Sequence, residues 1–284
     1  MKTTQWFTGA SGNAIAADIS GPVSGRPVML LHGGGQTRHS WSRAHDALAE
    51  RGYRVISLDA RGHGESQWLA DGDYSLQAQM DDLLAVIDTL PAPAVLIGAS
   101  MGGVHSLVAC AEHPGIAAAL VLVDVTPQLE PKGIAHILDF MTRHADGFAS
   151  LEEASLAVDA YNPNRAKRTE TKGLEKNLRL RDNGRWYWHW DPRFISGDHS
   201  KRVALVSARM QNAAGRIDIP TLLVRGQQSE VVSLEGVEAL KALIPQLEFV
   251  DVEGAGHMVA GDRNDAFNAA ILAFLERHSP TPLT

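Results

Sequence analysis

Residues 98–102 of the chain, Gly-Ala-Ser-Met-Gly, fit the pattern G-x-S-x-G and decide the fold. They follow the short apolar run Val95–Ile97 directly, and a helix-like segment, Val104–Glu112, comes after them. A chain that turns this sharply from strand to helix holds its central serine in a strained conformation, with the hydroxyl exposed above the sheet. The helix N-terminus also directs backbone N–H groups toward that hydroxyl. Because strand and helix signals flank the motif on the correct sides, we interpret Ser100 as the serine of a nucleophile elbow rather than part of an ordinary glycine-rich loop.

Short aliphatic runs alternate with longer amphipathic segments on both sides of this elbow. The runs lie at Val28–Leu31, Val55–Leu58, Val95–Ile97 and Leu120–Val123, and strand signals resume later in the chain at Thr221–Val224 and Glu248–Val252. Runs this short, without polar alternation, are typical of strands covered on both faces of a parallel sheet. Helices are expected over Leu76–Leu90, from the spacing of its apolar residues, and over Asp262–Arg277. The alternation predicts an α/β fold with a mostly parallel sheet flanked by helices.

The domain organisation follows from a break in this alternation. From Pro127 to about Ile217 the chain is polar and helix-like. The full length of 284 residues approaches two domains at about 150 residues each. We predict instead one core domain, residues 1–126 and 218–284, interrupted by a helical cap, or lid, at residues 127–217.

Composition excludes several classes of protein. A formal net charge of -7 disfavours nucleic-acid binding, which needs a cationic surface. The single cysteine, Cys110, excludes an intramolecular disulfide and a multi-cysteine metal site, and we expect it to be a small core residue. No apolar run approaches the ~20 residues that span a bilayer, and the N-terminus resembles no signal peptide. These features predict a cytoplasmic globular protein without a membrane or nucleic-acid partner.

A glycine-rich turn supplies a candidate oxyanion hole. His32-Gly33-Gly34-Gly35 follows the first strong strand run, where a backbone N–H can face the same cleft as Ser100. We assign the hole to the amides of Gly34 and Met101, because charge develops on a carbonyl oxygen when a serine attacks it. A phosphate-binding loop is disfavoured because no G-K-[ST] sequence follows.

One of the twelve histidines stands where a general base is needed. His257 ends the stretch Gly254-Ala255-Gly256-His257, just after the last strand run and before the last helix. That place agrees with the chain order serine, acid, histidine. We therefore predict that His257 activates Ser100. The histidines show no metal-binding spacing, so no metal is predicted.

These motifs, together with residues 59–66 (Asp-Ala-Arg-Gly-His-Gly-Glu-Ser), occur in one order across about residues 25–280. The chain thereby resembles α/β-hydrolase-fold proteins of the cap-bearing esterase, epoxide-hydrolase and haloperoxidase-like group. The resemblance implies no cofactor, and it implies structural hydrogen bonds for Asp59 and Arg61 beneath the site. Epoxide hydrolases of this group carry aspartate at the elbow, whereas Ser100 supports acyl transfer. The resemblance therefore implies cleavage of a carboxylic ester or thioester.

The acid of the triad has two candidates. In most of the family it follows the strand after the cap, about three residues beyond a glycine, and Ser229 occupies that position here, with Glu230 adjacent. A subset of the family places the acid after the strand that precedes the cap, where Asp124 stands. We favour Asp124 because it closes an apolar run, where an unpaired carboxylate is costly. Glu230 remains the alternative.

The substrate is expected to contact the predicted cap. Residues 186–190, Trp-Tyr-Trp-His-Trp, either pin the cap to the core or form an aromatic wall over Ser100. We predict Trp186, Trp188 and Met258 as substrate-binding residues. The resulting hypothesis is a serine hydrolase, monomer or homodimer, that cleaves an ester of a small apolar substrate through an acyl-enzyme. The alternatives are a lactone, thioester or carbon–carbon bond hydrolase on the same triad, or a non-catalytic small-molecule receptor.

Overall fold

The computed structural model of the chain describes residues 1–161, 173–262 and 264–281. Residues 162–172 of the predicted cap lie outside this described part. The centre of the molecule is an eight-stranded sheet with the order β1-β2-β4-β3-β5-β6-β9-β10. Its strands are β1 (Thr3–Thr8), β2 (Ala14–Ser20), β3 (Pro27–Leu31), β4 (Arg54–Leu58), β5 (Ala94–Ala99), β6 (Ala117–Val123), β9 (Thr221–Gly226) and β10 (Leu247–Val252).

Six of these strands, β3 to β6, β9 and β10, contain the predicted strand runs, and they pair with one another in the parallel sense. The expected mostly parallel α/β fold is therefore confirmed. Two further strands precede them, since β1 pairs with β2 and β2 with β4 in the antiparallel sense. Sequence analysis missed this pair because β1 is an exposed edge strand and neither strand forms a short aliphatic run.

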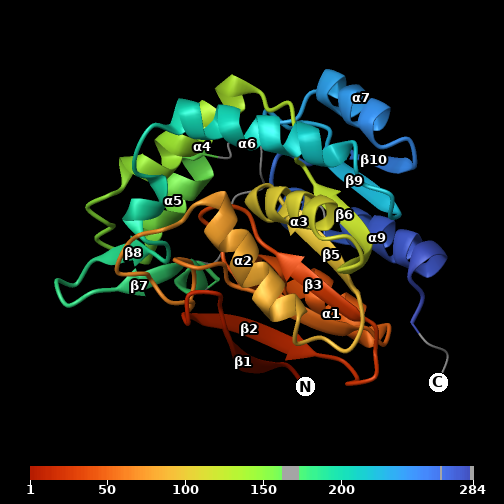
Figure 1. Ribbon diagram of the computed structural model, residues 1–284. Helices are drawn as coiled ribbons and strands as arrows, with labels where there is room; N and C mark the ends of the chain where they lie inside the picture. Colours follow the sequence, from red (N-terminus) through yellow and green to blue (C-terminus); the bar gives the residue numbers. More distant parts are fainter. Residues whose placement is uncertain (162–172, 263, 282–284) are drawn as a thin grey trace.

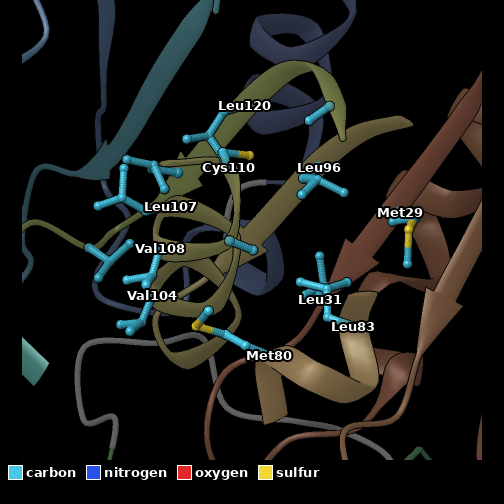
Figure 2. Close-up of a cluster of buried hydrophobic side chains, with 14 of the residues drawn as sticks. Met29, Leu31, Met80, Leu83, Leu96, Val104, Leu107, Val108, Cys110 and Leu120 are labelled. Atoms are coloured by element: carbon cyan, nitrogen blue, oxygen red, sulfur yellow. The ribbon is translucent and has the colours of Figure 1, made fainter. Parts of the chain in front are cut away.

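Helices cover both faces of the sheet, as Figure 1 shows. One face packs against α1 (Ser42–Glu50) and α9 (Asn264–His278), and the other against α2 (Leu76–Ile87) and α3 (Met101–Glu112). Figure 2 shows Met80 of α2 and Leu107 of α3 gathered with Leu96 of β5 in the hydrophobic cluster on this second face. Cys110 belongs to the same cluster and burial raises its pKa to about 12, so the prediction of a structural core residue is confirmed.

A long connection joins β6 to β9 and coincides with the predicted cap. It contains α4 (Pro131–Arg143), α5 (Leu151–Tyr161), the strands β7 (Leu178–Leu180) and β8 (Trp186–Trp188), and α6 (His199–Ala214). Figure 1 shows α4, α5 and the β7–β8 hairpin gathered at one side of the molecule. The hairpin differs from the expected all-helical stretch, because aromatic side chains favour strands when a partner strand is available. The second half of α6 crosses onto α3, where Met210 and Ala213 join the core of the sheet.

Two further helices, α7 (Leu234–Leu243) and α8 (Val259–Asp262), flank β10 in the chain. In the described part of the chain, no helix combines the length and apolar character needed to cross a membrane.

Candidate active site

Ser100 stands at the point where β5 turns into α3. Its backbone angles are φ 46° and ψ −113°, which a residue with a side chain rarely adopts. Glycines make the turn possible, because a Cβ on Gly98 would lie 2.3 Å from the carbonyl oxygen of Gly102. A Cβ on Gly102 would in turn lie 2.3 Å from the carbonyl oxygen of Leu31. The geometry is that of the strained turn that G-x-S-x-G predicts.

A series of backbone hydrogen bonds ties the ends of four neighbouring strands together. The N–H of Ser100, after β5, donates to the carbonyl oxygen of Val123 in β6 at 3.0 Å. The N–H of Asp124, after β6, donates to Val224 in β9 at 2.8 Å. The N–H of Gln227, after β9, donates to the last residue of β10 at 3.0 Å. The first residue beyond each of these strands is therefore held by the next strand, and we name this series the strand-end ladder.

His257 and Asp124 meet at this edge of the sheet although 133 residues separate them. The Nδ1 atom of His257 lies 2.6 Å from Oδ2 of Asp124, whose side chain is fully buried. Asp124 also accepts hydrogen bonds from the N–H of Gly226, at 3.0 Å, and from the hydroxyl of Ser229, at 2.6 Å. Three hydrogen-bond donors thus compensate the burial of this carboxylate. Because Asp124 contacts Nδ1 of His257, the other ring nitrogen, Nε2, does not contact this carboxylate.

Glu230, the other candidate acid, points elsewhere. Its side chain is 71% exposed and lies 3.1 Å from Nδ1 of His136 in α4. The one-residue shift from Ser229 to Glu230 therefore turns the carboxylate away from His257. Ser229 itself contacts Asp124, a contact that sequence analysis did not predict for this residue.

The glycine-rich turn after β3 has most of its amides occupied. The N–H of Gly33 donates to Oε1 of Gln36, at 3.1 Å, and the N–H of Gly35 donates to Nε2 of His63, at 3.2 Å. Within the described residues, the N–H of Gly34 has no acceptor. Met101 is the first residue of α3, so its N–H has no acceptor within the helix. The two amides assigned to the oxyanion hole are thus the ones available to a ligand.

A buried histidine, His63, accepts a hydrogen bond from this glycine-rich turn. Burial lowers the pKa of His63 to about 3, so its imidazole is neutral and Nε2 can accept the N–H of Gly35. The Nδ1 atom of His63 faces the carbonyl oxygen of Arg61 at 3.1 Å, which assigns the proton to Nδ1. His63 thus contacts the candidate oxyanion loop, a contact that the sequence analysis, which treated it only as part of the turn 59–66, did not predict.

The two charged residues of that turn make the structural hydrogen bonds that the resemblance implied. The guanidinium of Arg61 forms two hydrogen bonds with the carboxylate of Asp82, at 2.6 and 2.7 Å. Asp59 is fully buried, and it accepts hydrogen bonds from the backbone and side chain of Arg38. These ion pairs join the turn 59–66 to α2, through Asp82, and to the segment that carries Arg38.

A cavity of about 730 Å³ opens over the elbow. Ser100, Met101, His257 and Met258 all line it, and so does Gly34. From the inserted part of the chain it takes mainly apolar and aromatic side chains: Ile134, Ile137, Phe140, Tyr161, Trp188, Trp190 and Phe194. The candidate nucleophile, base and oxyanion donors therefore share one largely apolar chamber.

The aromatic run 186–190 contributes differently from the prediction. Trp188 and Trp190 line the cavity with their rings stacked, 5.0 Å between centroids and 11° between planes. Trp186 is not among the residues that line this cavity, so its role as a substrate-binding residue stays a prediction. It lies at the far end of β8, where its backbone pairs with Phe148. Trp190, two residues beyond the strand, takes the place over the cavity that we expected for Trp186.

Within the described ranges, no group of three or more histidine, cysteine, aspartate or glutamate side chains has an arrangement that could hold a metal ion. The arrangement of Ser100, His257 and Asp124 is suited to nucleophilic attack by an activated serine hydroxyl.

Comparison with known proteins agrees with this geometry. The family model of the alpha/beta hydrolase fold matches residues 26–263. The chain is 29% identical over 260 residues to the esterase Rv0045c of Mycobacterium tuberculosis, covering 88% of this chain and 82% of that protein. It is 25% identical to the sn-1-specific diacylglycerol lipase ABHD11 of Mus musculus, covering 93% and 84%. The crystal structure of E-2-(acetamidomethylene)succinate hydrolase superposes with a TM-score of 0.86 at 21% identity, covering 97% of this chain and all of that one.

The family model spans the strands, the elbow, the inserted segment and the loop that carries His257, which is most of the chain. Together with the sheet order and the relatives, it identifies this protein as a hydrolase that belongs to the α/β-hydrolase fold family.

Proposed function

We propose that the protein is a serine hydrolase that cleaves a carboxylic ester of a small, largely apolar substrate through an acyl-enzyme. One observation carries this proposal: His257, held by Asp124 at 2.6 Å, lines the same cavity as Ser100. The names of two relatives, an esterase and a diacylglycerol lipase, support the ester as the bond that is cleaved. The apolar lining of the cavity supports an apolar acyl or alcohol group.

In the first half of the reaction, the hydroxyl of Ser100 attacks the ester carbonyl carbon and its proton passes to Nε2 of His257. The carboxylate of Asp124 holds Nδ1–H and stabilises the imidazolium that forms. The amides of Gly34 and Met101 donate to the oxyanion of the tetrahedral intermediate. The C–O bond to the alcohol then breaks, the alcohol leaves with the proton from His257, and the acyl group remains on Ser100.

In the second half, a water molecule attacks the acyl-enzyme and gives its proton to His257. The same two amides hold the second oxyanion, and collapse of this intermediate returns the proton to Ser100 and releases the acid. The inserted segment, residues 127–217, acts in this proposal as a cap that supplies the apolar wall and excludes bulk water from the chamber.

The test is a pair of serine variants. We expect Ser100→Ala to lose labelling by a fluorophosphonate and to lower kcat on p-nitrophenyl butyrate by at least about a thousandfold, because the nucleophile is removed. Ser207→Ala is the matched control, since Ser207 lies on α6 and does not line the cavity. It should keep labelling and turnover. A wild-type protein that neither reacts with the phosphonate nor turns over any ester would contradict the proposal and favour a non-catalytic receptor.

A further inference from the structure

The charged side chains that line the cavity are basic, within the described residues. The whole chain has more acidic than basic residues, with a net charge of -7. In the described part of the chain, by contrast, no aspartate or glutamate lines the cavity, whereas Arg43, Lys176 and Arg202 do. Arg43 and Lys176 are exposed, and Arg202 is half-buried. A chamber with cationic groups and no carboxylate attracts a ligand with negative charge.

Arg202, in the first half of α6, is a guanidinium with donors to spare. Its Nη1 donates to the carbonyl oxygen of Phe194, at 2.9 Å, and its Nη2 donates to Nδ1 of His199, at 2.8 Å. Neither acceptor is a carboxylate, and they use two of the five N–H groups that an arginine offers. No carboxylate of the described residues lies within ion-pair distance of this side chain. Burial accordingly lowers the pKa of Arg202 without a compensating acid.

Some half-buried or buried arginines of this protein pair with a carboxylate. Others, namely Arg26, Arg54, Arg179 and Arg185, donate to backbone carbonyls or a histidine, and they do not line the cavity. Arg209, two turns further along the same helix, forms two hydrogen bonds with the carboxylate of Glu112, at 2.9 and 2.7 Å. Arg61 pairs with Asp82 in the same bidentate way. Taking a guanidinium out of water without a counter-charge costs free energy, which a bound anion would recover. Arg202 is the half-buried arginine without a carboxylate partner that lines the cavity, within the described residues, and this marks it as the cation whose partner belongs to the ligand.

Arg202 also lies within reach of the reacting centre. Its guanidinium carbon is 5.9 Å from the centre of the Phe194 ring. The same ring also lies against the oxyanion loop, since Phe194 would be 3.5 Å from a Cβ on Gly34. The cation and the proposed oxyanion hole thus approach the same phenyl ring, and Val203 and Val206 also line the cavity.

We propose, on the basis of the function proposed above, that the ester substrate carries a second, non-reacting carboxylate that binds to Arg202. The planar fork of a guanidinium matches the two oxygens of a carboxylate, which gives such a contact its directional preference. The apolar lining between Ser100 and Arg202 then holds the hydrocarbon chain that joins the ester to this carboxylate. The substrate class is an ester of an ω-carboxylated chain, with the charge on either the acyl or the alcohol side.

Two pairs of esters test this inference. The acyl-side pair is the mono-p-nitrophenyl ester of suberic acid and the same compound with its free carboxylate capped as a methyl ester. The alcohol-side pair is the butyrate ester of 6-hydroxyhexanoic acid and its methyl-capped form. We expect the wild type to prefer the anionic member of at least one pair by about tenfold in kcat/KM, as one charge-assisted contact provides. We expect Arg202→Gln to abolish this preference, so that kcat/KM for the anionic ester falls to that for its capped form in the same variant.

Two further variants keep the test sharp. Arg202→Lys retains the charge and should retain part of the preference. Arg209→Gln makes the same chemical change on the same helix but outside the cavity, and should keep the full preference. Equal rates within both pairs for the wild type, or an unchanged preference in Arg202→Gln, would overturn the inference. Absence of hydrolysis of all four esters by the wild type would instead overturn the proposed function, and this inference with it.

Discussion

Ser100 and Asp124 adopt the same uncommon backbone conformation. With φ of 46° and 50°, they are the two residues other than glycine that have a positive φ in the described part of the chain. Each costs about 1–3 kcal/mol in isolation, and such strain persists where the surroundings hold it. Both are the first residues beyond adjacent parallel strands, and both donate their N–H to the next strand in the strand-end ladder. The same turn therefore presents the hydroxyl and the carboxylate at one edge of the sheet.

The two candidate acids can be separated by kinetics. We expect Asp124→Asn to lower kcat by about 10⁴-fold, because an amide neither stabilises the imidazolium of His257 nor selects its tautomer. Glu230→Gln, whose side chain is exposed and faces His136, should stay within about twofold of the wild type. Steady-state rates on p-nitrophenyl butyrate decide the matter. A large loss in Glu230→Gln together with a small loss in Asp124→Asn would exchange their roles.

Ser229 is expected to position Asp124. Its hydroxyl donates to Oδ2 of Asp124 and accepts the N–H groups of Val231 and Val232, at 3.1 Å each. We expect Ser229→Ala to lower kcat about tenfold with little change in KM, because the carboxylate loses one of three donors. Ser229→Thr keeps a hydroxyl at this position and should recover most of the rate. A purely structural role would instead lower the stability of both variants and leave kcat of the folded fraction unchanged.

A second pair of variants uses the same geometry. The hydroxyl of Ser229 and Nδ1 of His257 each lie 2.6 Å from one oxygen of Asp124. A carboxylate at position 229 is therefore close enough to take over the contact with His257. In the Asp124→Asn background, adding Ser229→Asp should raise kcat at least about tenfold, as measured with the same ester, whereas adding Ser229→Ala should not.

Some single residues of the site could be predicted from the sequence and others could not. Ser100, Gly34 and His257 belong to local motifs whose glycines and neighbouring strands are visible in the sequence. The contact of Ser229 with Asp124 depends on the pairing of β6 with β9 across the whole inserted segment, which no local pattern contains. The exchange of Trp186 for Trp190 depends on the direction in which the β7–β8 hairpin points, and the sequence alone does not provide it.

At the scale of elements, the turn between β5 and α3 depends on the absence of side chains. A Cβ on Gly98 meets backbone atoms of Gly102 and Gly103 within 2.5 Å, and backbone cannot move aside as a flexible side chain can. We expect Gly98→Ala to lower the free energy of unfolding by about 3 kcal/mol, as overpacking does. Chemical denaturation measures this change. Gly215→Ala is the control, because its φ of −67° is ordinary and nothing lies within 4 Å of the added methyl group, so its stability should be unchanged.

The elements themselves were predictable to different degrees. Strands β3 to β6 and β9 are buried along nearly their whole length, so their apolar runs stand out from the segments around them. The edge strand β10 is half-buried along most of its length. The hairpin β7–β8 lies within a polar stretch and owes its pairing to Phe148, Trp188 and their neighbours, which form an apolar cluster of their own. Strand pairing that depends on such tertiary contacts overrides the local pattern.

At the scale of the whole molecule, buried histidines should make the fold sensitive to acid. Burial lowers the pKa of His63 and of His105 to about 3, and that of His45 to about 4. In the unfolded chain a histidine has its ordinary pKa of about 6.5, so between pH 6.5 and about 4 the unfolded state binds more protons. The free energy of unfolding therefore falls as the pH falls through this range, by about 1.4 kcal/mol per pH unit for each histidine.

Urea titrations at pH 7.5 and pH 5.0 measure this effect. The midpoint should be clearly lower at pH 5.0, and the loss should begin below pH 6.5, before the carboxylates titrate. Equal midpoints at the two pH values, or a higher one at pH 5.0, would contradict the assignment of neutral, buried imidazoles.

The strand-end ladder has a consequence for how the protein loses activity on heating. Three hydrogen bonds of one kind join the ends of β5, β6, β9 and β10, and two of their donors, Ser100 and Asp124, carry the proposed chemistry. Ser100 and Asp124 therefore have no hinge of their own, and we do not expect them to unfold locally while the central sheet stays folded. Partial damage elsewhere, such as loosening of α4 or α5, leaves the catalytic groups in register. Heat inactivation then coincides with melting of the central sheet, and the enzyme keeps its reacting groups aligned for as long as it stays folded.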